Sequence, residues 1–178
     1  TTIGKQHPVY LVSETDRVEM IVMEAYDGQL MTAQVLLRPK TMLVPGRTYR
    51  LVVENLSEGK NISRYDYKTN KYVPIEWMVS GAPDTTMPQW AAEPIEIGKH
   101  YVMFGCGPAL GVEFKIKTNE SLSMLVKVEL MGIGTDKWRT YYLPVSDGKI
   151  DIGHGMCGGE FTLREAKEFE VKFTLVDG

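Results

Sequence analysis

The stretch Val112-Glu-Phe-Lys-Ile-Lys117 decides the fold class, because apolar and charged residues alternate in it without interruption. A period of two places the apolar side chains on one face of a β-strand and the charged side chains on the other. The stretch therefore predicts a strand with one face against a core and the other in solvent.

The same period recurs along the chain on both sides of this stretch. The other alternating segments are residues 18–23, 31–37, 49–54, 122–130 and 169–175. Such segments, divided by turn residues at short intervals, predict an all-β fold of roughly nine to eleven strands. We expect an antiparallel β-sandwich or small barrel with long loops and at most one short helix.

Local signals mark the connections between these segments. Asp27-Gly28 and Asp147-Gly148 each stand between two strand-like segments, and both predict tight hairpins. Thr162-Leu-Arg-Glu165 matches a capping box and could begin the one short helix. Strand-like sequence flanks it on both sides, so helix and strand both remain open there.

Length and composition are those of an ordinary globular chain. With 178 residues, 43% of them hydrophobic and 24% charged, we expect residues 1–178 to form a single β domain. A net charge of -3 gives no electrostatic reason to bind nucleic acid, so no sequence-specific nucleic-acid partner is expected. No apolar run approaches the roughly 18 residues of a membrane span, so no membrane partner is expected either.

Signals for the cellular compartment point in two directions. The beginning, Thr1-Thr-Ile-Gly4, lacks a signal-peptide pattern and fits a cytoplasmic product, although a secreted chain after cleavage would look the same. Three glycosylation sequons, at Asn55, Asn61 and Asn119, point toward secretion, although Asn and Ser also gather in turns.

The two cysteines, Cys106 and Cys157, both lie in glycine-rich turns. They are too few to indicate a disulfide scaffold. We expect free thiols that the function does not need.

No catalytic or metal-binding motif is present. The three histidines, His7, His100 and His154, have no partner at metal-ligand spacing. His154-Gly-Met-Cys157 contains the ligand types of a copper site, but their order and spacing differ from that site. Nucleophile elbow, P-loop and dinucleotide motifs are missing. We therefore predict a protein that is not an enzyme, with no catalytic residue, cofactor or metal; a hydrolase on a β scaffold is the less favoured alternative.

Aromatic residues gather in one polar stretch, as Tyr65, Tyr67, Tyr72 and Trp77. They could fill one face of a sheet, anchor a protein interface or stack on sugar rings. The sequence leaves these three interpretations open.

The segment from Gly81 to Pro94 breaks the alternation and contains three prolines. A loop of this length in a compact domain usually has a function. We predict that it is an intersubunit contact with Met87 and Trp90 as apolar residues, and that Trp77 also belongs to the interface. The alternative is that Trp90 folds back onto its own sheet.

The last third of the chain resembles a known layout. After the alternating strand from Leu122 come a polar turn at Gly134-Thr-Asp-Lys137, the segment Trp138-Arg-Thr-Tyr-Tyr-Leu-Pro144, a glycine-rich turn and the closing strand Glu168–Leu175. This order resembles the C-terminal part of bacteriophage virion proteins, such as tail tube subunits and capsid decoration proteins.

The resemblance implies a non-enzymatic, self-assembling structural subunit, located in the virion and made in the host cytoplasm. Its partners would be copies of itself and other virion proteins. The alternative is a secreted or surface β-sandwich module that binds glycans through Trp77 or Trp90, or that binds a protein partner.

Overall fold

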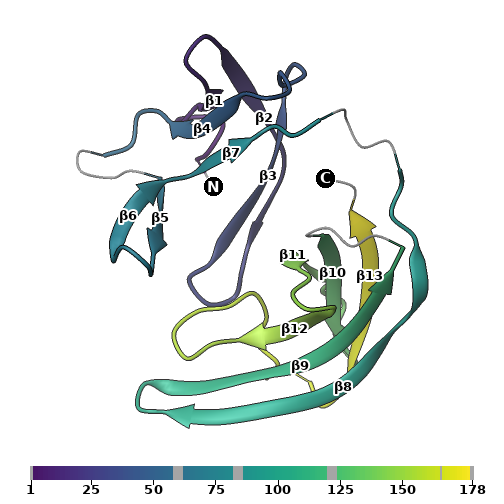
Figure 1. The fold of residues 1–178 in the computed structure, drawn as a ribbon. Coiled ribbons are helices and arrows are strands. Elements are labelled where there is room, and N and C mark those ends of the chain that lie inside the picture. The colour runs from purple at the N-terminus through teal and green to yellow at the C-terminus, as the bar shows by residue number, and fades with distance from the viewer. Residues whose placement is uncertain (1, 58–61, 82–85, 120–123, 165, 177–178) are drawn as a thin grey trace. The chain divides into compact units, whose positions relative to one another are not determined.

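A computed structural model describes the chain at residues 2–57, 62–81, 86–119, 124–164 and 166–176 (Figure 1). These ranges contain thirteen β-strands and no helix, and the strands pair antiparallel in several sheets. The all-β prediction is therefore confirmed. In the same ranges, no helix is long and apolar enough to cross a membrane.

The chain divides into two compact units, which we describe separately. The first comprises residues 1–25 and 35–84, and the second residues 26–34 and 85–178. The prediction of a single domain over residues 1–178 stays a prediction.

The first unit is built on a five-stranded sheet with the order β3-β2-β1-β4-β7 and on a separate β5–β6 hairpin. Its small core contains Leu11, Val18 and Tyr49, and the Tyr49 hydroxyl donates to the Asp16 carboxylate at 2.9 Å. The strands are β1 (Val9–Val12), β2 (Arg17–Asp27), β3 (Ala33–Pro39), β4 (Thr48–Val53), β5 (Ser63–Asp66), β6 (Lys71–Pro74) and β7 (Glu76–Met78). The connection between β2 and β3 is grouped with the second unit.

The second unit contains two three-stranded sheets, β11-β10-β13 and β12-β9-β8. The β8–β9 hairpin is long and curved (Figure 1). Three register shifts near its beginning account for part of this curvature, since β-bulges bend and twist a strand. The strands are β8 (Trp90–Phe104), β9 (Gly107–Thr118), β10 (Leu125–Gly132), β11 (Arg139–Pro144), β12 (Lys149–His154) and β13 (Phe169–Val176).

One hydrophobic core joins the two sheets of the second unit. Side chains from both sheets meet in a single buried cluster, as expected for two sheets packed face to face. Val126, Val128 and Leu130 of β10 are almost fully buried in it. The cluster consists of Ile116, Val126, Val128, Leu130, Tyr141, Leu143, Ile150, Ile152 and Phe161.

Strands β9 and β12 approach closely because two glycines face each other. Gly111 pairs with Gly153 in the ladder. A Cβ on Gly153 would come to 2.1 Å from the Leu110 carbonyl oxygen, which is backbone and cannot rotate away. This part of the sheet therefore has no room for a side chain at position 153.

The two hairpin predictions have different outcomes. Asp147 and Gly148 both have positive φ, and Ser146 and Lys149 exchange two backbone hydrogen bonds around them, which makes a tight two-residue turn. Asp27-Gly28 instead begins a wider connection, because the Gly28 N–H donates to the Thr32 carbonyl and β3 starts only at Ala33.

One expected loop is partly strand. Residues 90–94 of the proline-containing segment belong to β8. Pro94 is compatible with a strand because β8 lies at the edge of its sheet, where a missing N–H breaks no ladder. The described part of the capping-box match, residues 162–164, is irregular rather than helical, and Glu165 lies outside the described residues.

Candidate interaction surfaces

Among the described residues of the second unit, the longest strand at a sheet edge is β8. This strand has 15 residues, pairs with β9 on one side and ends its sheet on the other. An unpaired strand edge presents backbone donors and acceptors that another strand can satisfy. The length of β8 makes this edge a candidate interface.

Apolar side chains on β8 are exposed to solvent. They are Ile95, Ile97, Tyr101, Val102, Met103 and Phe104, each between 44% and 62% exposed. Because successive side chains of a strand point to opposite faces, the run 101–104 exposes apolar side chains on both faces of the hairpin. We call this set the β8 surface. Contiguous exposed apolar side chains of this kind mark interaction sites.

Charged groups lie next to the β8 surface. Lys99 forms an ion pair with Glu96 at 3.3 Å, and the His100 Nε2 lies 3.5 Å from the Asp151 carboxylate. Burial raises the pKa of Asp151; the neighbouring His100 partly offsets this rise, and Glu113 adds to it. Apolar side chains with charged neighbours form the pattern of an interface centre with a polar rim.

The predicted interface residues fall in different environments. Trp90 is half-buried at the beginning of β8 and packs against the core cluster of the second unit. This placement matches the alternative in which Trp90 folds back onto its own sheet.

Met87 is 73% exposed in the segment before β8. Trp77 is 52% exposed on β7, an edge strand of the first unit. Residues 82–85 of the predicted loop lie outside the described residues.

Three of the aromatic residues that the sequence singled out gather on the β5–β6 hairpin. The ring of Tyr65 packs edge-on against Tyr67 and Tyr72, with centroid distances of 5.1 and 5.2 Å. Tyr67 and Tyr72 are 85% and 74% exposed, so these rings do not fill a covered sheet face. We call the three residues the tyrosine cluster.

The turn between Tyr65 and Tyr72 is held by Asp66. Its carboxylate accepts hydrogen bonds from the Thr69 hydroxyl at 2.7 Å and the Lys68 N–H at 2.9 Å. These bonds, above all the one from Thr69, lower the pKa of Asp66. The Asp66 carboxylate therefore stabilises the turn, and both of its oxygen atoms accept hydrogen bonds from it.

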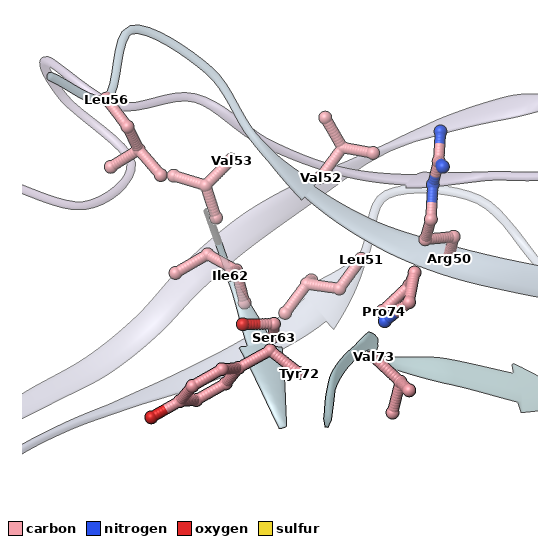
Figure 2. Close-up of a pocket in the computed structure, with 10 residues that line it drawn as sticks. All are labelled: Arg50, Leu51, Val52, Val53, Leu56, Ile62, Ser63, Tyr72, Val73 and Pro74. Carbon is pink, nitrogen blue, oxygen red and sulfur yellow. The ribbon is translucent and has the colours of Figure 1, made fainter. Parts of the chain in front are cut away.

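A pocket of about 470 Å³ lies beside the tyrosine cluster. Figure 2 shows Leu51 and Val53 of β4 on one side of it and the Tyr72 ring on the other, with Ile62 between them. Its lining is mostly apolar, with Arg50 as its charged residue. The full lining is Arg50, Leu51, Val52, Val53, Leu56, Ile62, Ser63, Tyr72, Val73 and Pro74.

Groups that could bind a metal are scattered among the described residues, where no three His, Cys, Asp or Glu side chains come together as a candidate site. The His7 ring lies 3.3 Å from the Glu54 carbonyl oxygen. His154 is buried at the end of β12, and its Nδ1 lies 2.8 Å from the Gly155 carbonyl oxygen. The absence of a metal and a cofactor stays a prediction.

The cysteines are close together although they lie 51 positions apart in the sequence. Both thiols are free and exposed, and the two Sγ atoms lie 3.5 Å apart. Sequence reasoning placed both in turns but gave no sign that the turns are neighbours. That information comes from the pairing of β9 with both β8 and β12.

Two of the three sequon asparagines have structural roles. Asn55 has a positive φ of 57°, and its amide donates to the Gln6 carbonyl at 3.2 Å. The Asn119 side chain accepts from the Gln89 N–H at 2.8 Å. These contacts explain asparagine at both turns without glycosylation. Asn61 lies outside the described residues.

Comparisons of the chain with protein-family models, with curated proteins and with solved structures found no match.

Proposed function

We propose that this chain is a non-enzymatic structural subunit that self-associates through the free edge of β8. The neighbour would be an edge strand of a second copy, which would extend the β12-β9-β8 sheet across the boundary between subunits. A contact of this kind that repeats head to tail closes into a ring or grows into a tube.

The observation that carries the proposal is the combination of a long unpaired edge with exposed apolar side chains. Proteins that remain monomeric usually protect such an edge with charges, short strands or a cover. β8 has Glu93, Glu96, Lys99 and one proline in its first part, but its last four residues, Tyr101–Phe104, are all apolar and exposed. A partner strand would satisfy the backbone and cover these side chains together.

The register indicates which β8 residues would make the new backbone contacts. A two-residue turn joins Phe104 to its ladder partner Gly107, and pairing is regular from Gly98 onward. In a hairpin with such a turn, the flanking residues bond to each other and alternate positions direct N–H and C=O outward. Tyr101 and Met103 are therefore the positions whose backbone faces the free edge.

The assignment to a bacteriophage particle, of the tail tube or capsid decoration type, is supported by the layout of the last third of the chain. That segment supplies β10, β11, β12 and β13, and so most of the core of the second unit. A rigid core carrying a free edge strand suits a repeating subunit. Other virion proteins would then be the further partners, and the virion the location.

The test measures the mass of the assembly and its dependence on β8. We expect light scattering on the purified chain to show particles many times heavier than the 20.1 kDa subunit, and electron microscopy to show rings or tubes. The double variant Tyr101→Lys/Met103→Lys places two charges on the edge, and we expect it to stay monomeric with an unchanged melting temperature.

The control is Tyr67→Lys, which changes an exposed tyrosine of the first unit and should leave assembly intact. A wild-type chain that remains monomeric at high concentration would refute self-association. Normal assembly of the double variant would refute the role of β8.

A second function has an observation of its own, the tyrosine cluster beside the pocket. Exposed aromatic rings next to a cavity can stack on sugar rings, so the first unit could bind a glycan. Titration with a panel of oligosaccharides, followed by tyrosine fluorescence, tests this function. Binding that disappears in Tyr67→Ala and Tyr72→Ala would support a glycan module, and no binding in the wild type would exclude glycans of that panel.

A further inference from the structure

The two cysteines come together at one end of the β12-β9-β8 sheet. Cys106 forms the tip of the β8–β9 hairpin, and Cys157 lies in the loop that follows β12. His154 at the end of β12 pairs with Leu110 near the beginning of β9, so the hairpin tip and the loop lie side by side. A Cβ on Gly107 would lie 3.6 Å from the Met156 carbonyl oxygen, which confirms that the two backbones are in contact range.

The sulfur atoms are already within van der Waals contact. Their separation of 3.5 Å has to shrink to the roughly 2.05 Å of an S–S bond, which a rotation of exposed side chains and a small backbone shift can supply. The flanking glycines favour that adjustment, because a Cβ on Gly105 would meet open space. Both thiols are exposed and so accessible to a small oxidant.

We propose that Cys106 and Cys157 form a reversible intramolecular disulfide by exchange with a low-molecular-weight disulfide such as oxidised glutathione. One cysteine thiolate attacks the small disulfide, forms a mixed disulfide and releases one small thiol. The second cysteine then attacks the protein sulfur of the mixed disulfide, which breaks the mixed S–S bond, forms the Cys106–Cys157 bond and releases the second small thiol. Two protein thiols are oxidised, one small disulfide is reduced, and the two protons end on the released thiols.

The contact between the thiols also affects their reactivity. Hydrogen bonding with Cys106 raises the pKa of Cys157, so less Cys157 thiolate is present at neutral pH. Because the thiolate is the attacking species, we expect bridge formation to be faster above neutral pH.

The bridge would tie the tip of the β8–β9 hairpin to the loop after β12. The closed loop spans 51 positions of the sequence, and closing a loop of that size restricts the unfolded chain. The last residues of β8 adjoin the hairpin tip, so the same bond would hold the exposed end of that strand in place. The disulfide does not depend on self-association, since it forms within one chain.

The test incubates the purified full chain either with dithiothreitol or with oxidised glutathione. In the oxidised sample we expect loss of both titratable thiols, a mass lower by two hydrogen atoms and one linked pair of proteolytic peptides containing Cys106 and Cys157. We also expect the melting temperature to be higher than in the reduced sample by about 5–15 °C, the range that a bridge of this loop length predicts.

Cys106→Ser and Cys157→Ser are the matched controls, and neither should gain stability with the oxidant. The reduced wild type and both variants should melt at similar temperatures, since exposed thiols contribute little. Two thiols still free after oxidation would overturn the proposal. A product capped by glutathione at both cysteines, or bridges only between chains, would overturn it as well.

Discussion

Strands β10 and β8 both belong to the second unit and both carry many apolar residues, yet their environments are opposite. β10 lies between β11 and β13, and its residues Val126, Val128 and Leu130 are at most 1% exposed. β8 lies at the edge of its sheet, and its residues from Ile95 to Phe104 include six exposed apolar side chains. Position within the sheet, and not hydrophobicity alone, decides whether an apolar strand contributes to the core or needs a partner.

The largest expected effect comes from the central strand. Leu130→Ala removes a buried side chain from the core cluster, and we expect a loss of about 2–5 kcal/mol in the free energy of unfolding. The matched variant in β8 is Ile97→Ala, at a side chain that is 44% exposed, and we expect a loss below about 1 kcal/mol. Urea unfolding at low protein concentration measures both. Equal losses would contradict the comparison, because they would mean that β8 is covered within the monomer.

The next effect concerns the beginning of β8, which packs against the core although the strand lies at the sheet edge. Trp90 at its beginning is half-buried against the core, so we expect Trp90→Ala to lower the free energy of unfolding by about 1–3 kcal/mol. Trp77→Ala, at a side chain that is 52% exposed, serves as the control and should cost less. Thermal unfolding of the monomer measures the difference. An unchanged melting temperature in Trp90→Ala, together with a loss of assembly, would instead support the interface role that the sequence predicted.

The smallest effect concerns the charged residues beside the β8 surface. Burial raises the pKa of Asp151 in the folded state, so the folded protein holds this proton more tightly than the unfolded chain does. The contribution of Asp151 to the free energy of unfolding is therefore most favourable below the ordinary aspartate pKa. It falls as the pH rises through the higher pKa that Asp151 has in the folded state. Asp151→Asn removes this dependence.

We therefore expect the melting temperature of Asp151→Asn, relative to wild type, to increase from acidic to neutral pH. Parallel melting curves at several pH values measure this difference. A relative melting temperature that decreases over the same range would show that the ion pair with His100 outweighs burial.

Period-two patterning was sufficient to predict one central strand, β9, and one edge strand, β13. The segment Val112–Lys117 lies in β9, and residues 169–175 lie in β13. The Asp147-Gly148 turn was also predictable, since its two positive φ angles suit these residues. Asp27-Gly28 was misleading, because its sequence does not reveal that the connection continues to Thr32.

None of the alternating segments of the sequence falls in β8, and part of the reason is physical. Pro94 and the adjacent bulges interrupt its alternation, and proline in a sequence usually indicates a loop. An edge strand tolerates both features because one side of its backbone has no ladder to lose. Pro94 and the bulges, which make the beginning of β8 hard to predict from sequence, are therefore compatible with its position at the sheet edge.

For the candidate surfaces, the sequence indicated which residue types take part, but it did not indicate their exposure or which of them lie close together. The sequence singled out the tyrosine cluster but could not show that Tyr67 and Tyr72 are exposed. It located Cys106 and Cys157 in turns, but their proximity depends on the pairing of β9 with two other strands. Contacts of this kind come from topology, which local sequence does not specify.

The facing glycines Gly111 and Gly153 have a consequence for the evolution of this chain. Any side chain at position 153 would collide with backbone, whereas the charged face of β9 tolerates many substitutions. Homologues that have diverged across most of the surface should still retain glycine at position 153. A glycine in each of the two strands that pair as β9 and β12 do here is therefore a signature by which distant relatives could be sought.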